Sequence, residues 1–337
     1  MAPRTITDIA NELGLSVTTI SRVLNGKGDQ YRIGKETQIR VKQVAEKHNY
    51  FPNQFAANLR SGKSNTIALS IPSISNPFFA RIASDLNKEL RHIEFMTIFN
   101  ESDEDETIEA DSLARLQSRN IEGLIIAPCG ANSNELRKLH ENGLPIVCID
   151  RYFDDIDIPY VATDNYAGGY SATKYLIDIG HSNIACIQGN RSSMPNIRRV
   201  EGYTRAMEEA ENKHLYIEGD KFDEQNGYLE TKLLLQNREP VTAIFTLSNT
   251  IAIGCLKALK EEGLNVPEDM SLITFDDSPY LELLSPPISC IAQPIMEISK
   301  VAIKLLLSKM NNEARPTKKV LLKPKLIHRS SVRSLGK

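Results

Sequence analysis

From Asn65 onward the chain alternates short apolar runs with amphipathic segments, and no other feature restricts the fold as strongly. The runs TIALSIP, GLIIAP, PIVCID, NIACIQG and TAIFTL are almost entirely apolar, and helical periodicity separates most of them. Strands that are apolar on both faces belong to parallel sheets covered by helices on both sides. The units are too many for one compact sheet, so we predict two α/β subdomains with a ligand cleft at the strand ends.

The N-terminal segment shows helical periodicity and no strand signal. Ile9 and Leu13 lie on one face of a first helix, Gly14 interrupts it, and Ser16 is a plausible N-cap for a second. A third helix is expected over about 35–48. The pattern TITDIANELGLSVTTISRVLNG therefore has the parts of a helix-turn-helix. Periodicity alone fits an ordinary helical hairpin with a solvated polar face equally well.

The second helix carries side chains suited to DNA. Thr18 and Arg22 are four residues apart and share a face, and an arginine can pair with the edge of a guanine through two hydrogen bonds. We expect Val17, Thr18 and Arg22 at base edges, and phosphate contacts from Ser16, Thr19, Ser21 and Asn25.

The charge is distributed unevenly along the chain. Residues 1–64 contain ten Lys/Arg and five Asp/Glu, a net +5, and the remainder contains 30 and 38, a net −8. A basic head on an acidic body indicates that only the head meets a polyanion. No apolar run is long enough to span a membrane and the N-terminus has no apolar signal core, so we expect a cytoplasmic protein.

The segment PNQFAANLRSGKS, residues 52–64, follows the head. Asn53 could cap a helix over roughly 54–60, which is too short to be stable alone. Such a helix would fold on pairing with a dimer mate on DNA, with Leu59 as an apolar wedge in the minor groove. Taken alone, the segment fits a plain linker better.

Together these motifs resemble the lactose/galactose/purine repressor family of transcription regulators. The resemblance continues through NPFFARI, VATDNYAGGYSATKYLIDIGH, RRVEGY and GCLKALKEEGLNVPEDMSLITFDD, and it spans residues 5 to about 332. It implies an all-α helix-turn-helix head and an α/β core like the periplasmic sugar-binding proteins, with two Rossmann-like parallel-sheet subdomains. It also implies a homodimer that binds double-stranded DNA at a near-palindromic operator.

The resemblance also implies domain boundaries, because the chain of such a core crosses between subdomains near Asp164, Gln293 and Lys323. The segment RSSVRSLGK at 329–337 looks like a frayed tail. The expected parts are a head (1–51), a hinge helix and linker (52–64), a core (65–332) with an N-subdomain (65–163 and 293–323) and a C-subdomain (164–292 and 324–332), and a tail (333–337).

One departure from the family lies in NGKGDQYRIGKETQIRV, which is a couple of residues longer than the usual loop before the third helix. Its Tyr31, Arg32 and Ile33 either touch the DNA backbone or only lengthen the turn, and we prefer the second interpretation.

Matching the family's ligand positions one by one implies an effector site of aromatic, carboxylate, guanidinium and amide groups. Such groups suit a sugar, whose hydroxyls donate and accept hydrogen bonds and whose ring has apolar faces. An arginine after the strand-end aspartate resembles sugar-binding members, whereas purine-binding members carry an aromatic residue there; purine-like and sugar-phosphate effectors remain alternatives. The implied residues are Asn76, Phe78, Phe79, Asp150, Arg151, Arg199, Phe222, Asn249, Asp276 and Gln293.

Two other classes of protein compete with this interpretation. An enzyme is disfavoured because the sequence shows no nucleophile elbow, phosphate-binding loop or histidine spacing for a metal, so we expect neither metal nor cofactor. A sugar-binding protein without a regulatory role would explain the cleft, but not the basic head or the missing signal peptide.

Overall fold

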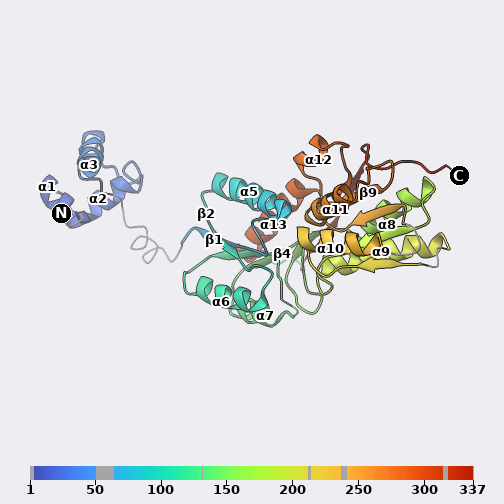
Figure 1. Cartoon of the computed structure of the whole chain (residues 1–337). Helices are drawn as coiled ribbons and strands as arrows, with labels where there is room; N and C mark the ends of the chain where they lie inside the picture. Colours follow the sequence, from blue (N-terminus) through green and yellow to red (C-terminus); the bar gives the residue numbers. More distant parts are fainter. Residues whose placement is uncertain are drawn as a thin grey trace. The chain divides into compact units, whose positions relative to one another are not determined.

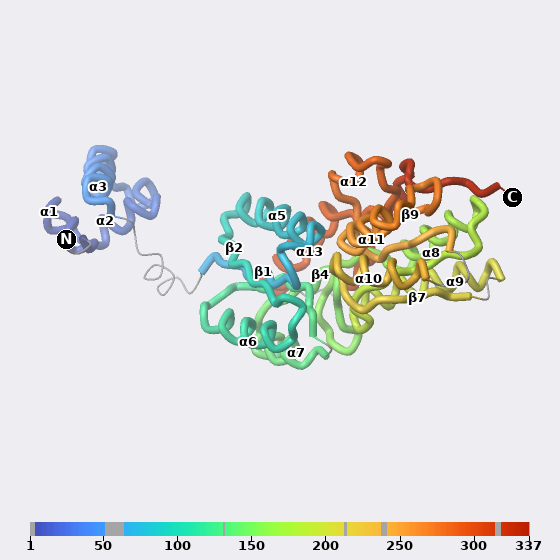
Figure 2. Tube along the Cα trace, viewed as in Figure 1, coloured from blue at the N-terminus to red at the C-terminus, as the bar shows by residue number. Residues whose placement is uncertain are grey.

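The computed structural model describes residues 4–50, 64–130, 132–211, 214–236, 241–313 and 318–336. The chain forms two compact units, a head up to Ser64 and a core from Asn65 (Figures 1 and 2). The expected hinge helix, including Leu59, lies outside the described residues. None of the helices described is long and apolar enough to cross a membrane.

Local hydrogen bonds explain why the head forms a helix-turn-helix. Thr5 and Asp8 cap the first helix reciprocally, since each side chain accepts from the other's backbone N–H. Gly14 ends that helix at φ +64°, and the Ser16 hydroxyl caps the second by accepting from the N–H of Thr19 at 3.1 Å. The helices are α1 (Ile6–Leu13), α2 (Val17–Leu24) and α3 (Lys35–Lys47), around a core of Ile9, Ala10, Ile20, Val23, Val41 and Ala45.

The first sheet of the core has the strand order β11-β5-β4-β3-β1-β2, and all its pairs are parallel. Two separate hydrophobic clusters cover its faces, one with α5 and α13 and the other with α6 and α7 (Figure 1). The elements are β1 (Thr66–Ile71), α5 (Pro77–His92), β2 (Met96–Glu101), α6 (Glu106–Gln117), β3 (Gly123–Ile126), α7 (Asn134–Glu141), β4 (Ile146–Ile149), β5 (Tyr160–Thr163), α13 (Ile295–Met310) and β11 (Lys319–Leu322).

The second sheet has the order β12-β10-β9-β8-β6-β7. The cluster on one face includes α8 and α9, and that on the other includes α10, α11 and α12. The elements are α8 (Asn165–Asp178), β6 (Ile184–Ile187), α9 (Met194–Glu209), β7 (Tyr216–Glu218), α10 (Glu224–Leu234), β8 (Ala243–Thr246), α11 (Asn249–Glu261), β9 (Ser271–Phe275), α12 (Pro279–Leu283), β10 (Ser289–Ala292) and β12 (Lys325–Ile327).

The predicted pair of α/β subdomains is confirmed, with one exception to parallel pairing. β12 runs antiparallel to β10. It follows β11 after a two-residue link, without an intervening helix. Because β11 ends at the side where the two sheets face each other, the chain enters the second sheet there and runs away from the cleft.

The chain passes between the sheets at β5–α8, β10–α13 and β11–β12. As a result, α13 lies beside α5 on the first sheet although the two are far apart in sequence (Figure 2). Three connecting segments between two subdomains leave room for a hinge motion that opens or closes the space between them.

The expectation of a frayed tail at 329–336 is wrong. Ser331 is fully buried and its hydroxyl accepts from the N–H of Ser289 at 2.8 Å. The N–H of Arg333 donates to the hydroxyl of Ser271 at 3.0 Å. The polar composition of this segment therefore reflects hydrogen bonding to the second sheet.

Close contact between α8 and α9 positions the middle of the cleft. A Cβ built on Gly169 would lie 2.2 Å from the carbonyl oxygen of Arg199, so only glycine allows this approach. We expect Gly169→Ala to lower the free energy of unfolding by about 2–3 kcal/mol in urea denaturation, because the backbones must separate. Gly130→Ala is the matched control, since its Cβ would meet nothing closer than 3.6 Å. Equal stability of the two variants would contradict this account.

Candidate functional site

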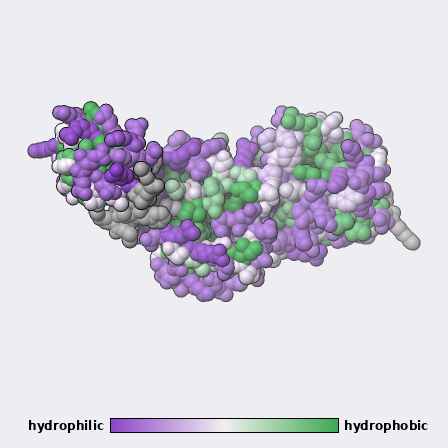
Figure 3. All heavy atoms as spheres, turned by 60° about the vertical axis from the view of Figure 1, so that its left-hand side comes forward, coloured by the Kyte–Doolittle hydropathy of each residue, from purple (hydrophilic) through white to green (hydrophobic). Residues whose placement is uncertain are grey.

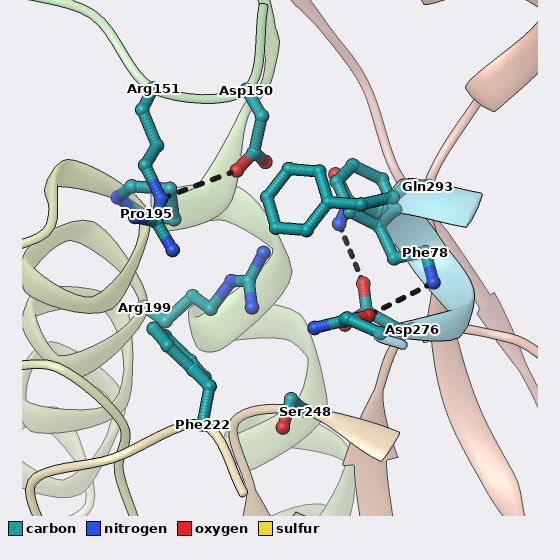
Figure 4. Close-up of a pocket in the computed structure, with 11 residues that line it drawn as sticks. Phe78, Asp150, Arg151, Pro195, Arg199, Phe222, Ser248, Asp276 and Gln293 are labelled. Atoms are coloured by element: carbon teal, nitrogen blue, oxygen red, sulfur yellow. Dashed lines mark hydrogen bonds and ion pairs between the residues drawn. The ribbon is translucent and has the colours of Figure 1, made fainter. Parts of the chain in front are cut away.

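A cavity lies between the two sheets, close to the carboxyl ends of their strands (Figure 4). It encloses about 300 Å³, part of which is open to solvent. Its walls come from both subdomains, so ligand contacts there would bridge the two. The lining residues are Asn76, Phe78, Phe79, Asp150, Arg151, Pro195, Arg199, Phe222, Ser248, Asp276 and Gln293.

The aromatic part of the cavity begins where α5 follows β1. The Asn76 side chain caps α5 by accepting from the N–H of Phe78 at 3.0 Å, and Pro77 occupies the first turn. Phe78 and Phe79 pack edge to face with their ring centroids 5.0 Å apart. On the other subdomain the ring of Phe222 lies against Gly189, where a Cβ would come within 2.3 Å of it.

Asp150 and Arg151 stand directly after β4. Asp150 adopts φ +59°, a left-handed conformation that is uncommon for residues other than glycine. Both terminal nitrogens of Arg151 donate to the carboxylate of Glu104 at 2.6 Å. Its Nε lies 3.9 Å from Asp150 Oδ2, too far for a hydrogen bond. Within the described residues, Asp150 Oδ1 and Arg151 Nε are buried and have no hydrogen-bond partner.

Asp276 occupies the equivalent place after β9 and is also left-handed, at φ +73°. Its carboxylate accepts from Nε2 of Gln293 at 2.6 Å. The carbonyl oxygen of the same Gln293 side chain accepts from the hydroxyl of Thr163. Thr163 ends β5 and Gln293 follows β10, so this chain of hydrogen bonds links two of the crossovers between the subdomains.

Arg199 of α9 projects between the two aspartates (Figure 4). Its Nε donates to Asn165 Oδ1 at 2.8 Å and its Nη1 to the carbonyl of Leu247 at 2.7 Å. Its guanidinium also lies over the ring of Phe275, with Cζ 3.6 Å from the ring centroid. These contacts hold a buried cation in one orientation.

The electrostatics of the cleft reflect burial opposed by ion pairing. Burial raises the pKa of Asp150 to about 6, although Arg199 and Arg151 act in the opposite direction. Burial also raises the pKa of Asp276, and Arg199 and the hydrogen bond from Gln293 oppose that rise. Burial thus disfavours the ionised form of both aspartates, and the same arginine, Arg199, opposes this effect at each of them.

Asn249 is the residue of the implied effector site that does not line the cavity. It is fully buried at the start of α11, where its Nδ2 donates to the hydroxyl of Ser278 at 2.7 Å. Its neighbour Ser248, the N-cap of α11, lines the cavity instead. Pro195, in the first turn of α9, also lines the cavity and is not among the residues that the sequence implies. Proline in a first helical turn is well tolerated and was the available signal.

The surface of α2 presents the residues expected to meet DNA. Val17 and Thr18 are exposed, whereas Arg22 is half-buried. The hydroxyls of Ser16 and Thr19 hydrogen-bond to each other at 2.9 Å. At the other end, Asn25 Nδ2 donates to the carbonyl of Ser21 at 2.8 Å. Ser21 is half-buried and Asn25 is exposed.

A helix-turn-helix head and a two-sheet core with a polar and aromatic cleft define a ligand-binding DNA regulator. The family model "Bacterial regulatory proteins, lacI family" matches residues 5–53, and "Periplasmic binding protein-like domain" matches 173–332. The HTH-type transcriptional regulator DegA of Bacillus subtilis is 32% identical over 98% of this chain and 99% of its own. The chain belongs to the lacI family, whose members are DNA-binding transcription regulators and not enzymes.

One further relative resembles the chain in sequence, and one solved structure resembles it in both sequence and fold. The ribose operon repressor of Haemophilus influenzae is 31% identical, over 98% of this chain and 99% of its own. A solved lacI-family regulator from Enterococcus faecium with bound ribose has a TM-score of 0.73 and 30% identity, and the match covers 80% of this chain and 99% of that one. Full-length similarity to regulators decides against a sugar-binding protein without a regulatory role.

Proposed function

We propose that this regulator is a repressor whose operator affinity is controlled by a neutral, sugar-like effector in the cleft. The unpartnered polar atoms carry the proposal: Asp150 Oδ1 can accept and Arg151 Nε can donate, and both are buried beside aromatic rings. A buried polar atom without a partner is costly. A ligand with hydroxyls and an apolar ring face would supply the missing partners. The ribose bound by one relative supports this class of ligand.

The hydrogen bonds that Arg151 and Arg199 already make favour a neutral sugar over a sugar phosphate as the effector. Both terminal nitrogens of Arg151 are taken by Glu104, and two nitrogens of Arg199 are taken by Asn165 and Leu247. A phosphate is best bound by a guanidinium fork with both arms free, and neither arginine offers one. Two carboxylates also face the same space, and they would repel a dianion.

A thermal-shift panel on the full chain tests the effector class. The panel contains neutral pentoses, hexoses and disaccharides, their phosphates, and purine bases. We expect a neutral sugar to raise the unfolding temperature in a concentration-dependent way, because a ligand that binds only the folded state stabilises it by mass action. A response confined to phosphorylated sugars or purines would refute the assignment.

The proposed DNA interface places Val17, Thr18 and Arg22 at base edges in the major groove, with Ser16, Thr19, Ser21 and Asn25 at phosphates. Leu59, outside the described residues, is the proposed minor-groove wedge. The head is the basic part of the chain, and a regulator that binds chromosomal DNA acts in the cytoplasm.

Arg22→Ala is expected to cost about 1–3 kcal/mol at one base pair of each half-site and to relax the preference there. The measurement uses a duplex recovered from a randomised pool with wild-type protein, together with its single-base-pair variants. Arg40→Ala, which removes an exposed charge from α3, controls for lost charge and should affect all duplexes alike. A uniform loss from Arg22→Ala would make Arg22 a phosphate contact.

We propose a homodimer that pairs through the core. In Figure 3, hydrophobic patches interrupt the largely hydrophilic surface. On α10 the exposed Leu229 and Leu233 are four residues apart and share a helix face, and Ile253 is exposed on the neighbouring α11. Two-fold symmetry would match two heads to a near-palindromic operator.

Leu233→Glu is expected to shift the protein from dimer to monomer in sedimentation at micromolar concentration, because it places a charge in an apolar contact. The control is Leu283→Glu on α12, whose leucine is 83% exposed. A dimeric Leu233→Glu protein would contradict this choice of surface.

A further inference from the structure

The loop that joins α2 to α3 is a compact, hydrogen-bonded turn. The N–H of Lys27 donates to the carbonyl of Arg22 at 2.8 Å, which ties the start of the loop to the end of α2. The N–H of Ile33 donates to the carbonyl of Gly28 at 2.9 Å, and that of Tyr31 donates to Lys27 at 3.2 Å. The loop therefore has one defined path between the helices.

Gln38 of α3 fixes this loop from the opposite side. Its Nε2 donates to Asp29 Oδ1 at 2.9 Å and to the carbonyl of Ile33 at 2.8 Å. Gly28 packs so tightly on it that a Cβ there would lie 2.4 Å from the side-chain amide carbon. Ile33 also packs against the hydrophobic core of the head. The loop that contains the extra residues Tyr31, Arg32 and Ile33 is thus anchored to α3. The side chain that it directs toward α2 is therefore held in place.

The side chain that the loop directs toward α2 is the ring of Tyr31. Cζ of Arg22 lies 3.7 Å from its centroid, which is close contact for a guanidinium over an aromatic face. Tyr31 as a whole residue is 45% exposed. Among the described residues, Arg22 has no side-chain hydrogen bond and no ion pair. Stacking uses the flat face of the guanidinium and leaves its in-plane N–H donors free.

We propose that Tyr31 is a positioning residue that holds Arg22 ready to contact a base edge. The inference rests on the base-reading role of Arg22 proposed above. A long arginine side chain loses rotamer freedom when it binds, and one that is already stacked on a fixed ring loses less of it. The same ring restricts the directions in which the guanidinium plane can point. Tyr31 therefore increases both affinity and base discrimination without touching a base itself.

The test measures binding of the full chain to the duplex recovered from a randomised pool and to its single-base-pair variants. We expect Tyr31→Ala and Tyr31→Leu to weaken binding to the recovered duplex by about three- to tenfold, the range for one freed side chain. The loss should be concentrated at the base pair that Arg22→Ala also relaxes. Tyr31→Phe keeps the ring and should bind within about twofold of wild type.

A double-mutant cycle separates positioning from direct contact. In an Arg22→Ala background, Tyr31→Ala should have no further effect. The Tyr31 variants keep the charge of the head, so unchanged binding to unselected duplex at low salt reports that their heads are folded. Additive effects of the two changes would overturn the proposal. An equal loss with Tyr31→Phe at every base pair would also overturn it, and would indicate that the hydroxyl contacts the DNA backbone. A uniform loss from Arg22→Ala alone would instead overturn the base-reading role.

Discussion

Arg199→Ala is expected to weaken effector binding about 100-fold, because buried hydrogen bonds from a charged group contribute about 1.5–3 kcal/mol. Arg199 is the cation between Asp150 and Asp276, and Asn165 and Leu247 hold it there. Without it, both carboxylates face the ligand with less compensation. Affinity is measured by calorimetry with the sugar that gives the largest thermal shift.

The same change should leave the DNA affinity of the ligand-free protein within about twofold of wild type. The cleft influences DNA affinity only through the effector that binds there, and no effector is present in this measurement. Arg198→Ala is the matched control, because Arg198 is the neighbouring residue on α9 and makes an exposed ion pair with Glu201. We expect Arg198→Ala to bind effector like the wild type. Loss of both activities in Arg199→Ala would indicate a folding defect, and unchanged effector affinity would remove Arg199 from the site.

Asp150→Asn is expected to stabilise the ligand-free core at pH 7.5 while weakening effector binding. The folded-state pKa of Asp150 is about 6, against an ordinary value of 3.8. The folded protein therefore holds more protons than the unfolded chain between these values, and its stability falls as the pH rises through that window. Above pH 6 the ionised carboxylate costs up to about 3 kcal/mol, which asparagine removes.

The sign of this effect is testable by urea denaturation at two pH values. At pH 7.5 the variant should be more stable than wild type, and near pH 4 the difference should largely disappear because wild-type Asp150 is then protonated. Asp154→Asn, in the following loop, is the control, because Asp154 is exposed and only loosely paired with Lys319. An Asp150→Asn protein that is no more stable than wild type at pH 7.5 would show that the ionised carboxylate does not destabilise the folded state.

The elements that could be predicted from sequence were those with strong local signals. β1, β3 and β4 are buried along their whole length, and their runs are almost entirely apolar. β7 and β12 have three residues each and incomplete burial, so their patterns are too short to recognise. The antiparallel direction of β12 depends on where the chain re-enters the second sheet, which no local pattern records.

The cleft shows the same division between local and non-local information. Asp150 and Asp276 were predictable because each directly follows an apolar strand and strand ends meet in such folds. The ion pair of Arg151 with Glu104 was not, since the two are 47 residues apart and meet only through the sheet. Asn249 and Ser248 are adjacent, and which of them faces the cavity is decided by the start of α11. The stacking of Tyr31 on Arg22 likewise depends on how Gln38 anchors the loop.

These features fit a mechanism in which effector binding closes the two subdomains about their three connecting segments. The core conformation would then set the spacing of the two heads in the dimer, so effector and operator bind with reciprocal coupling. Whether the effector releases or promotes DNA binding depends on which conformation each ligand prefers.

The most direct test of this account is the affinity of the full chain for its recovered duplex with and without a saturating concentration of the effector. A change of about 5- to 150-fold in Kd is predicted, the usual range of allosteric coupling. The Arg199→Ala protein should show no such change at the same effector concentration. An unchanged Kd for the wild type, with an effector that demonstrably binds the core, would contradict the claim that the cleft controls the head.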